Sequence, residues 1–505
     1  MPTRVERDSM GELEVPGEAY YGAQTERARR NFALSALRFS RSFIRALGLI
    51  KSAAAEVNAE LGRLSPVIAE AIAKVAREVA DGRLDDQFVV DVFQTGSGTS
   101  TNMNANEVIA GRANELLEPG RRGGRSPVHP NDAVNLGQSS NDVFPTAIHL
   151  AAREQIVTVL VPALERLERV LHERASAFDH VLKIGRTHLQ DAVPIRLGQE
   201  FSGYATQIAK ARARVAHAAE AMAELPLGGT AVGTGLNTHH DFGRLVAARL
   251  SALTGVSFRP AVNPFEALAN RDAAVEVSGA LKTAAVSLSN IANNVRWLAS
   301  GPRCGLGELA LPAIQPGSSI MPAKVNPVIP EAVMMTTARI VGNDATITWS
   351  NGLGSNFELN VMMPIIAFCL LESIELLTTA ADHLAEKCLD ARQFLDGLDV
   401  EGARCVEARE ENCRRSIERS LAMCTALAPR IGYDNAAALA KRAFHDDRTV
   451  REVALGLVDR TPEDIVSYLG PTASLEVLLG HGGYPTAHEL ESLLDPERQT
   501  HPSAV

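Results

Sequence analysis

Five long helical patterns occupy the middle of the chain, and they constrain its fold more than any other feature. Each is much longer than the average globular helix of about 11–12 residues. A soluble helix of such length must bury its apolar side against other helices. The sequence therefore predicts a mainly α protein built on a bundle of long helices. The five segments are 143–177, 197–225, 264–299, 330–350 and 356–388.

The last of these segments is apolar on nearly all sides. Residues 358–381 read ELNVMMPIIAFCLLESIELLTTAA, with three acidic residues and no basic one. A soluble helix of this kind is buried all round, within a bundle or between subunits. Pro364 lies inside the pattern and predicts a kink or a local break, because proline lacks the N–H of a helix interior.

The regions before and after the long helical segments have different sequence patterns. Residues 1–138 combine short helical patterns with loops, and Ser65 followed by Pro66 predicts a capped helix over 66–79. Residues from about 392 onward form shorter amphipathic patterns with turns at IGYD and HGGYP. We therefore predict three domains, 1–138, 139–391 and 392–505.

Composition excludes several classes of function. A formal net charge of −10 over 505 residues argues against general nucleic-acid binding, which needs a basic face. The six cysteines form no C-x-x-C pair, which argues against zinc ribbons and close-spaced iron–sulfur sites. The N-terminus has no apolar run, and no stretch of about 18 uncharged apolar residues is apparent. We expect a cytoplasmic protein without a membrane span.

Two polar loops in the first third of the chain contain groups that could bind a carboxylate. Ser97, Gly98 and Thr99 offer hydroxyls and a flexible backbone, although a helix-capping turn would use the same residues. Further along, HPND (129–132) and QSSND (138–142) precede a helical run. The N-terminus of a helix favours both a capping side chain and a bound anion, so both interpretations remain open.

Histidines occur in two other loops. His188 in GRTHLQ could exchange protons near neutral pH, although a loop histidine can also be purely structural. His239 and His240 are adjacent, and no third ligand is visible at metal spacing. We therefore expect no metal there.

A fourth loop, GSSIMPAKVNP (317–327), combines two serines, a lysine and an asparagine between three prolines, with Glu331 following. A buried Lys324 would need a partner, and a dicarboxylate would supply one. This combination is too specific for a linker.

The same loop matches the pattern G-S-S-x-M-P-x-K-x-N, and the chain thereby resembles the fumarase/aspartase superfamily. The resemblance extends from about Arg4 to about Ala443. It implies a three-domain fold in which the long helices of four subunits form one multi-helix core. It also implies a homotetramer whose active sites each draw loops from three chains. The other matching segments are QTGSGTSTNMNANEV, HPND, QSSNDVFPTA, GRTHLQDAVP, LGGTAVGTGLN and SGPRCGLGE.

Within the superfamily, QTGSGT, QSSND and NFELNV resemble the class II fumarases. Aspartate ammonia-lyases typically have alanine and threonine where Ser97 and Ser140 stand. Ala323 instead resembles the aspartase form of the signature loop. Two other departures are Tyr21, where tryptophan is common, and a longer stretch over 389–407. We expect reversible hydration of fumarate to L-malate; the alternatives are an aspartate ammonia-lyase and an inactive structural relative.

The resemblance also implies roles for individual residues, without a metal or another cofactor. Ser318 would remove the carbon-bound proton, His188 would protonate the leaving hydroxyl, and Glu331 would orient His188. Lys324 and Asn326 would stabilise the aci-carboxylate intermediate. The implied substrate-binding residues are Ser97, Gly98, Thr99, Ser139, Ser140, Asn141, Thr187, Ser319, Lys324 and Asn326. The implied second dicarboxylate site consists of Arg125, His129, Asn131 and Asp132.

Overall fold

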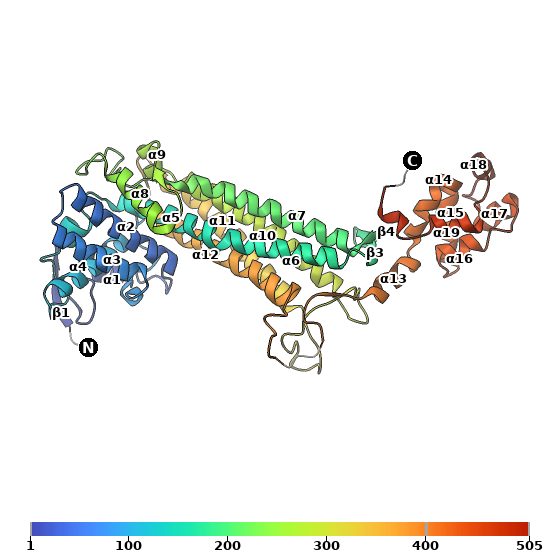
Figure 1. Ribbon diagram of the computed structural model, residues 1–505, viewed down its shortest axis with the longest axis horizontal. Helices are drawn as coiled ribbons and strands as arrows, with labels where there is room; N and C mark the ends of the chain where they lie inside the picture. Colours follow the sequence, from blue (N-terminus) through green and yellow to red (C-terminus); the bar gives the residue numbers. More distant parts are fainter. Residues whose placement is uncertain (1–2, 399–401, 503–505) are drawn as a thin grey trace. The chain divides into compact units, whose positions relative to one another are not determined.

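A computed structural model describes residues 3–398 and 402–502, which are mainly helical (Figure 1). They form two compact units, each assembled from separate stretches of chain. The first unit contains the chain up to Glu165 together with Lys210–Ser289 and Met334–Ala381. The second unit contains Arg166–Ala209, Asn290–Val333 and the chain from Asp382 onward. The division into three domains stays a prediction.

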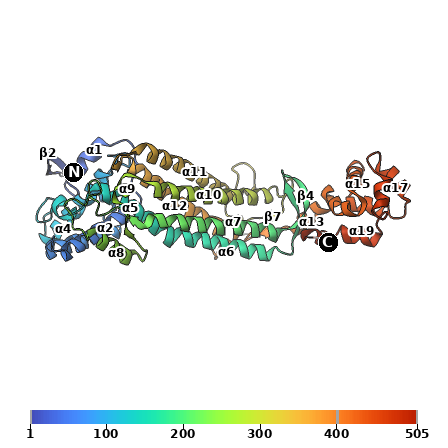
Figure 2. The same ribbon diagram turned by 90° about the horizontal axis from the view of Figure 1, so that it is seen from above.

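The predicted long helices are present, and most of their bounds are close to those expected. Helix α5 continues through a π-helical turn, η3, into α6, so that the run starts three residues before the predicted segment. Portions of α10 and α11 lie side by side in both views (Figures 1 and 2), joined by a hydrogen bond from the Thr337 hydroxyl to the carbonyl of Ala285. The long elements are α5 (Ser140–Gln155), η3 (Ile156–Leu160), α6 (Val161–Ala177), α7 (Leu197–Ala218), α10 (Asp272–Leu298), α11 (Val328–Gly354) and α12 (Met363–His383).

The predicted helix over 264–299 is wrong at its start. A short helix, α9 (Pro264–Ala269), ends at Asn270, whose backbone is extended. The backbone N–H of Arg271 then donates to the side-chain oxygen of Asn351, 2.9 Å away in the first unit. Because a distant side chain satisfies this N–H, the chain can leave the helix there and restart at Asp272 as α10.

The predicted segment 356–388 also begins later than expected. A small hairpin of β8 (Ser355–Asn356) and β9 (Leu359–Asn360) precedes α12. Pro364 is therefore the second residue of α12, where backbone N–H groups need no partner within the helix. Of the two outcomes expected at Pro364, the local break is the one seen, because the predicted segment is interrupted by the hairpin just before this proline. At its C-terminal end α12 continues as a π-helical stretch, η5 (Leu384–Leu389).

The core of the first unit is built around α2, most of whose residues are buried. Gly48 allows α3 to approach closely, because a Cβ there would lie 2.6 Å from the carbonyl oxygen of Ala76. Helix α3 is capped by Ser65 as predicted. The remaining elements of this unit are β1 (Thr3–Asp8), β2 (Gly11–Pro16), α1 (Ala23–Asn31), α2 (Arg41–Glu60), α3 (Pro66–Ala80), η1 (Asp85–Gln87), α4 (Thr99–Leu117), η2 (Pro130–Val134), η4 (Ala219–Ala223), β5 (Glu224–Leu225), α8 (Phe242–Thr254) and β6 (Arg259–Pro260).

The second unit packs short helices around its own apolar core, to which Ile184 of the β3–β4 hairpin contributes. The shorter amphipathic helices predicted after residue 392 are confirmed (Figure 1). The elements of this unit are β3 (Leu182–Thr187), β4 (Gln190–Arg196), β7 (Leu309–Ala310), β10 (Glu407–Ala408), α13 (Glu410–Arg419), η6 (Leu421–Leu427), α14 (Ala428–Ile431), α15 (Tyr433–His445), α16 (Val450–Leu455), α17 (Pro462–Leu469), α18 (Leu475–Gly480), α19 (Ala487–Leu493) and η7 (Arg498–Thr500).

The two departures from the superfamily lie apart from the loops of interest in sequence. Tyr21 is buried in the first unit, and its carbonyl accepts a hydrogen bond from Arg4. In the stretch 389–407, Asp390 pairs with Cys405 in an isolated bridge. Residues 399–401 of that stretch lie outside the described residues.

Two helical runs, Ser140–Ala177 and Met363–Leu389, are long and apolar enough to cross a membrane by length and composition alone. Both runs contain charged residues, Arg153 and Glu154 in the first and Glu372 and Glu375 in the second, so neither is the uncharged stretch that was expected to be absent. In each run 67% of the most apolar window is buried inside the fold. Burial by the chain's own helices identifies both runs as core helices.

The segment predicted to be apolar on nearly all sides is buried within the single chain. Among the described residues, α12 exposes no large apolar side chain. Of the two expected ways to bury this segment, the bundle is therefore the one seen, and contact between subunits is not needed. Helix α11 instead exposes Met335, Val341, Trp349 and Leu353, with Trp349 67% exposed.

Candidate active site

The loop that contains Ser97 and Thr99 is pressed against helix α5 in the first unit. Gly98 has a left-handed backbone, φ 73°, and a Cβ there would lie 2.0 Å from the Phe144 ring. Only glycine fits this position. The hydroxyl oxygens of Ser97 and Thr99 lie 2.9 Å apart and share a hydrogen bond at the start of α4.

The QSSND segment caps α5, which confirms the first of its two interpretations, helix capping and anion binding. The Ser139 hydroxyl accepts from the N–H of Asn141, and the Asp142 carboxylate accepts from the N–H of Ser139 at 2.9 Å. Ser140 and Asn141 are only partly buried at this helix start. The side chain of Asn102 donates to the Ser140 hydroxyl oxygen at 3.0 Å. Because that oxygen already accepts a hydrogen bond, its own proton is free to be donated to a ligand.

Asp142 also holds a glycine-rich loop in place. Its second carboxylate oxygen accepts from the backbone N–H groups of Gly228 and Thr230, at 3.1 and 2.9 Å. Asn141 reaches the same loop through the carbonyl of Ala231, 2.8 Å from its side-chain nitrogen. Burial raises the pKa of Asp142 to about 7, against the effect of its N–H donors. Three loops of the first unit are thereby linked at the N-terminus of α5.

The residues of the implied second dicarboxylate site also lie together in the first unit. His129 caps the π-helical turn η2, where its Nδ1 accepts from the N–H groups of Asn131 and Asp132. The Asp132 carboxylate lies 3.3 Å from the same nitrogen. Burial, followed by the charge of Arg125, lowers the pKa of His129. This histidine is therefore more readily neutral than an exposed one.

In the second unit, His188 stands at the tip of the β3–β4 hairpin. His188 and Leu189 form the two-residue turn, and both have left-handed backbones, with φ of 56° and 59°. Asparagine and glycine are the usual residues of such a turn, so a histidine and a leucine there indicate a functional constraint. Thr187 and His188 are both exposed in the single chain.

A group of buried charges anchors the base of this hairpin. Glu308 is completely buried, and its carboxylate makes two hydrogen bonds with Arg186, at 2.7 and 3.0 Å. Lys183, 2% exposed, lies 3.4 Å from Glu308 and 3.1 Å from Glu200. These opposite charges fix the strand that leads directly to Thr187 and His188.

The signature loop surrounds the Ser318 hydroxyl with backbone donors. Its oxygen accepts from the N–H groups of Ile320 and Met321, at 3.2 and 2.8 Å. The loop is closed on itself by hydrogen bonds from Gly317 N–H to the Lys324 carbonyl and from the Asn326 amide to the Gly317 carbonyl. Lys324 is exposed in the single chain, so its expected burial is not seen there.

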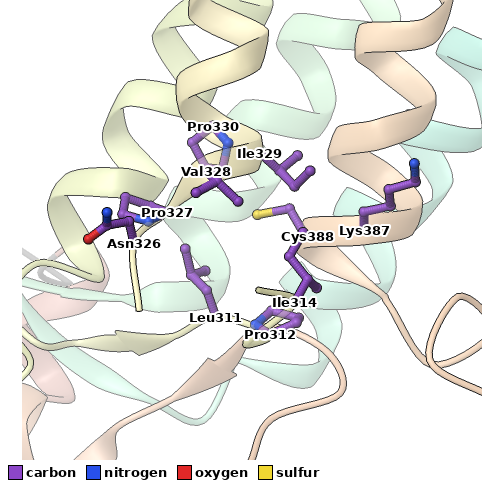
Figure 3. Close-up of a pocket in the computed structure, with 10 residues that line it drawn as sticks. All are labelled: Leu311, Pro312, Ile314, Asn326, Pro327, Val328, Ile329, Pro330, Lys387 and Cys388. Carbon is purple, nitrogen blue, oxygen red and sulfur yellow. The ribbon is translucent and has the colours of Figure 1, made fainter. Parts of the chain in front are cut away.

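Where the loop joins α11, its root is set in apolar side chains. Leu311, Ile314, Ile329 and Cys388 surround a small pocket, with Asn326 at its margin (Figure 3). Glu331 follows in the first turn of α11. Within the described part of the chain, no hydrogen bond joins Glu331 to His188, so the expected orienting contact stays a prediction.

Two features were missed by sequence reasoning. Asp241 lies beside His239 and His240, and one ligand atom from each lies within 4.8 Å of the others. The expectation that no third ligand group lies near these histidines was therefore wrong. All three residues are partly or fully exposed. The second feature is Lys51, a completely buried lysine beneath the QSSND segment. The sequence feature that could have indicated this buried lysine is its position inside the apolar helical segment LIKSAAAEV.

The predicted residues thus divide between the two units. The first unit holds Ser97, Gly98, Thr99, Ser139, Ser140 and Asn141, and separately Arg125, His129, Asn131 and Asp132. The second unit holds Thr187, His188, Ser318, Ser319, Lys324, Asn326 and Glu331.

Comparisons with known proteins agree over almost the full chain. A family model described as lyase matches residues 11–342, and a model described as the fumarase C C-terminus matches residues 423–473. The chain is 50% identical over 481 residues to a class II fumarate hydratase of Thermosynechococcus vestitus, covering 95% of this chain and 99% of that protein. It is 46% identical over 501 residues to a class II fumarate hydratase of Rhizobium meliloti, covering 99% of each.

A solved structure shows the same fold. The crystal structure of recombinant class II fumarase from Schistosoma mansoni superimposes with a TM-score of 0.88 at 38% sequence identity. The match covers 99% of this chain and 100% of that one.

Proposed function

The chain belongs to the class II fumarate hydratases of the fumarase/aspartase superfamily, and on that premise we propose that it interconverts L-malate and fumarate by acid–base catalysis. The observation that carries the mechanism is the Ser318 hydroxyl, which accepts hydrogen bonds from two backbone N–H groups of its own loop. Donors in that position stabilise negative charge on the oxygen.

In the direction of fumarate, Ser318 is the base. Its alkoxide removes the proton from the malate carbon next to one carboxylate, so the proton is transferred to the serine oxygen. A serine hydroxyl is a weak acid in water, and its alkoxide needs stabilisation to form. The N–H groups of Ile320 and Met321 supply that stabilisation. We assign further stabilisation to the positive charge of Lys324, which belongs to the same loop.

Loss of the proton leaves an aci-carboxylate with two negative charges. Lys324 and Asn326 stabilise it as a fixed cation and a fixed amide donor. One preorganised donor of this kind contributes about 2.7–4 kcal/mol to the transition state, which is roughly two to three powers of ten in rate. Because these groups act on the developing charge, they favour the intermediate over bound malate.

His188 then protonates the hydroxyl that leaves as water, and in the reverse direction it takes the proton from water. Glu331 orients its imidazole ring. Ser318 and His188 thus exchange the two protons of the reaction, and no step is assigned to a metal or a cofactor.

The remaining polar groups bind the dicarboxylate. The α5 N-terminus attracts a carboxylate through its dipole and its free N–H groups. Within the first unit, Thr99, Ser140 and Asn141 surround this helix start together with Ser97, Gly98 and Ser139. Thr187 and Ser319 supply hydroxyls from the hairpin and the signature loop. We assign Arg125, His129, Asn131 and Asp132 to a second, non-catalytic dicarboxylate site.

We propose that the active chain is a homotetramer, in which each site takes its loops from three subunits. The apolar face of α11, with Met335, Trp349 and Leu353 exposed, supports this, because soluble monomers rarely leave such a face uncovered. Lys324 would lose its exposure where the loops of other copies meet it. All six cysteines are free of disulfides, which supports a reducing compartment such as the cytoplasm.

The test is a comparison of substrates and of one variant. Purified protein should convert malate to fumarate, followed by the ultraviolet absorbance of fumarate, and chelator should not stop it. Ser318→Ala should lose nearly all turnover while keeping its circular dichroism spectrum. Wild-type turnover by Ser318→Ala would exclude Ser318 as the base. Ammonia release from L-aspartate in place of malate turnover would indicate an ammonia-lyase, and turnover of neither would indicate a structural protein.

A further inference from the structure

Lys51 is a buried cation without an adjacent counter-charge. Its side chain lies in α2 and has no exposed surface. Among the described residues, no carboxylate lies within salt-bridge distance of its ammonium. The ammonium instead donates to two neutral amide oxygens, those of Asn135 at 3.0 Å and Gln138 at 2.9 Å. An isolated buried charge is strongly unfavourable, so a cation in this setting calls for a function.

The amides around Lys51 lead to the substrate-binding loop. The Asn135 side-chain oxygen accepts from Lys51 and also from the amides of Asn102 and Asn106, each at 3.2 Å. The amide of Asn102 in turn donates to the Ser140 hydroxyl at 3.0 Å. An ammonium can only donate hydrogen bonds, so it requires Asn135 to present its oxygen to the cluster. Because the Asn135 oxygen accepts, the Asn102 amide must donate to it, and the same amide then donates to the Ser140 hydroxyl.

The charge that acts on Lys51 within the described residues comes from a carboxylate with other hydrogen-bond partners. Asp142, at the start of α5, is the one charged group with a resolved influence on it, and its carboxylate is occupied by the N–H groups of Ser139, Gly228 and Thr230. The groups that contact Lys51 from η2 and from Gln138 are neutral amides. Burial lowers the pKa of Lys51 to about 7, so the free enzyme holds its proton weakly.

We propose that Lys51 is a positioning residue of the substrate site. Its buried ammonium orients the Ser140 hydroxyl and supplies a positive charge that the bound dicarboxylate balances. Binding of the dicarboxylate therefore adds a proton to Lys51. This rests on the proposed function, because it places a substrate carboxylate at the α5 N-terminus. Lys51 does not touch the substrate. It acts through its hydrogen bond to Asn135, which in turn accepts from Asn102, and through the electrostatic attraction of its positive charge for a ligand in the QSSND loop.

The first test needs only the wild-type protein. Succinate has both carboxylates and nothing to eliminate, so its binding can be measured by calorimetry in two buffers of different ionisation enthalpy. Binding should take up close to one proton per site at pH 8, where Lys51 is mostly neutral before binding, and almost none at pH 6. Absence of proton uptake at pH 8 would overturn the proposal.

The second test asks whether Lys51 is the group that takes up the proton. Lys51→Met should abolish the uptake and raise the KM for malate roughly ten- to hundredfold, with a smaller change in kcat. Uptake that persists in Lys51→Met would belong to another group, such as Asp142, and would contradict the proposal. Lys74→Met, on the exposed side of α3, is the matched control and should behave as wild type.

Two measurements keep the result interpretable. If Lys51→Met does not fold, Asn102→Ala still tests the relay, because it should raise KM while leaving proton uptake in place; an unchanged KM would exclude the relay. Wild-type protein that binds succinate with proton uptake but converts neither malate nor fumarate would refute the proposed activity and leave the role of Lys51 intact. Normal turnover with an unchanged KM in Lys51→Met would refute the role of Lys51 alone.

Discussion

His149 is enclosed in the middle of α5, where it links that helix to strand β5. Its Nδ1 lies 2.6 Å from the carbonyl oxygen of Glu224, a distance at which the ring donates a hydrogen bond. Burial, with a contribution from the charge of Arg271, lowers the pKa of His149 to about 3. The ring therefore stays neutral at neutral and mildly acidic pH.

This residue should make the protein less stable in acid. A histidine in the unfolded chain has a pKa near 6.5. Below that pH the unfolded chain binds a proton that folded His149 does not, so the contribution is fully present above pH 6.5 and decreases as pH falls. Between pH 7.5 and 5.5, wild type should lose roughly 1.4 kcal/mol more unfolding free energy than His149→Gln. Urea unfolding at both pH values measures this, and identical pH dependence would contradict it.

At the scale of elements, the β3–β4 hairpin shows how His188, the proposed acid, is held at an exposed tip. Its turn has an unfavourable backbone at His188 and Leu189. Its base is fixed by the buried carboxylate of Glu308, which lies against Arg186 and Lys183. The rigid base compensates for the strained tip, so the position of His188 depends on residues that do not react.

Glu308→Gln should therefore weaken both stability and turnover. It removes the buried carboxylate that pairs with the partly buried Arg186, while Lys183 keeps its contact with Glu200. Breaking a buried pair typically destabilises by about 3–5 kcal/mol. The thermal midpoint should fall, and kcat should decrease more than KM changes, because the acid–base group is displaced. Glu410→Gln is the control: its contact with His180 is exposed and should contribute less than about 1 kcal/mol. Equal midpoints for the two variants would show that the buried pair does not anchor the hairpin.

At the scale of the whole molecule, the apolar face of α11 is a long helical surface that a single chain leaves uncovered. Trp349, Met335 and Leu353 are each more than half exposed. Burial of one such side chain contributes about 1.5–3 kcal/mol, so several of them in four copies would stabilise an assembly strongly.

Charges on this face should dissociate the assembly. Met335→Glu combined with Trp349→Glu should shift the sedimenting species from tetramer to smaller forms and remove activity, because sites shared between subunits are lost. Val67→Glu places a charge at an exposed position of α3 and should leave the tetramer intact. A double variant that sediments and turns over as wild type would refute both the interface and the shared site.

Local signals in the sequence were sufficient for much of the fold. The cap at Ser65, the helical periodicity of the long segments and the short helices after residue 392 all depend on residues close together in the chain. The predicted domain boundary at residue 138 separated Ser97 from Ser140, and the family pattern implied only that both bind substrate; the structure has both in one unit. Glycine at position 98 was noted for its flexibility, whereas its contact with Phe144 was visible only in the structure.

What the sequence determined by itself was local: helix starts, loop chemistry and the signature that identifies the family. The tertiary structure decided which apolar face is covered, where the helix breaks at Arg271, and that Lys51 is buried under the QSSND segment. Each of these depends on partners far along the chain, Asn351 for Arg271 and Gln138 for Lys51. A burial or a hydrogen bond of that kind depends on distances in space, which local periodicity does not encode.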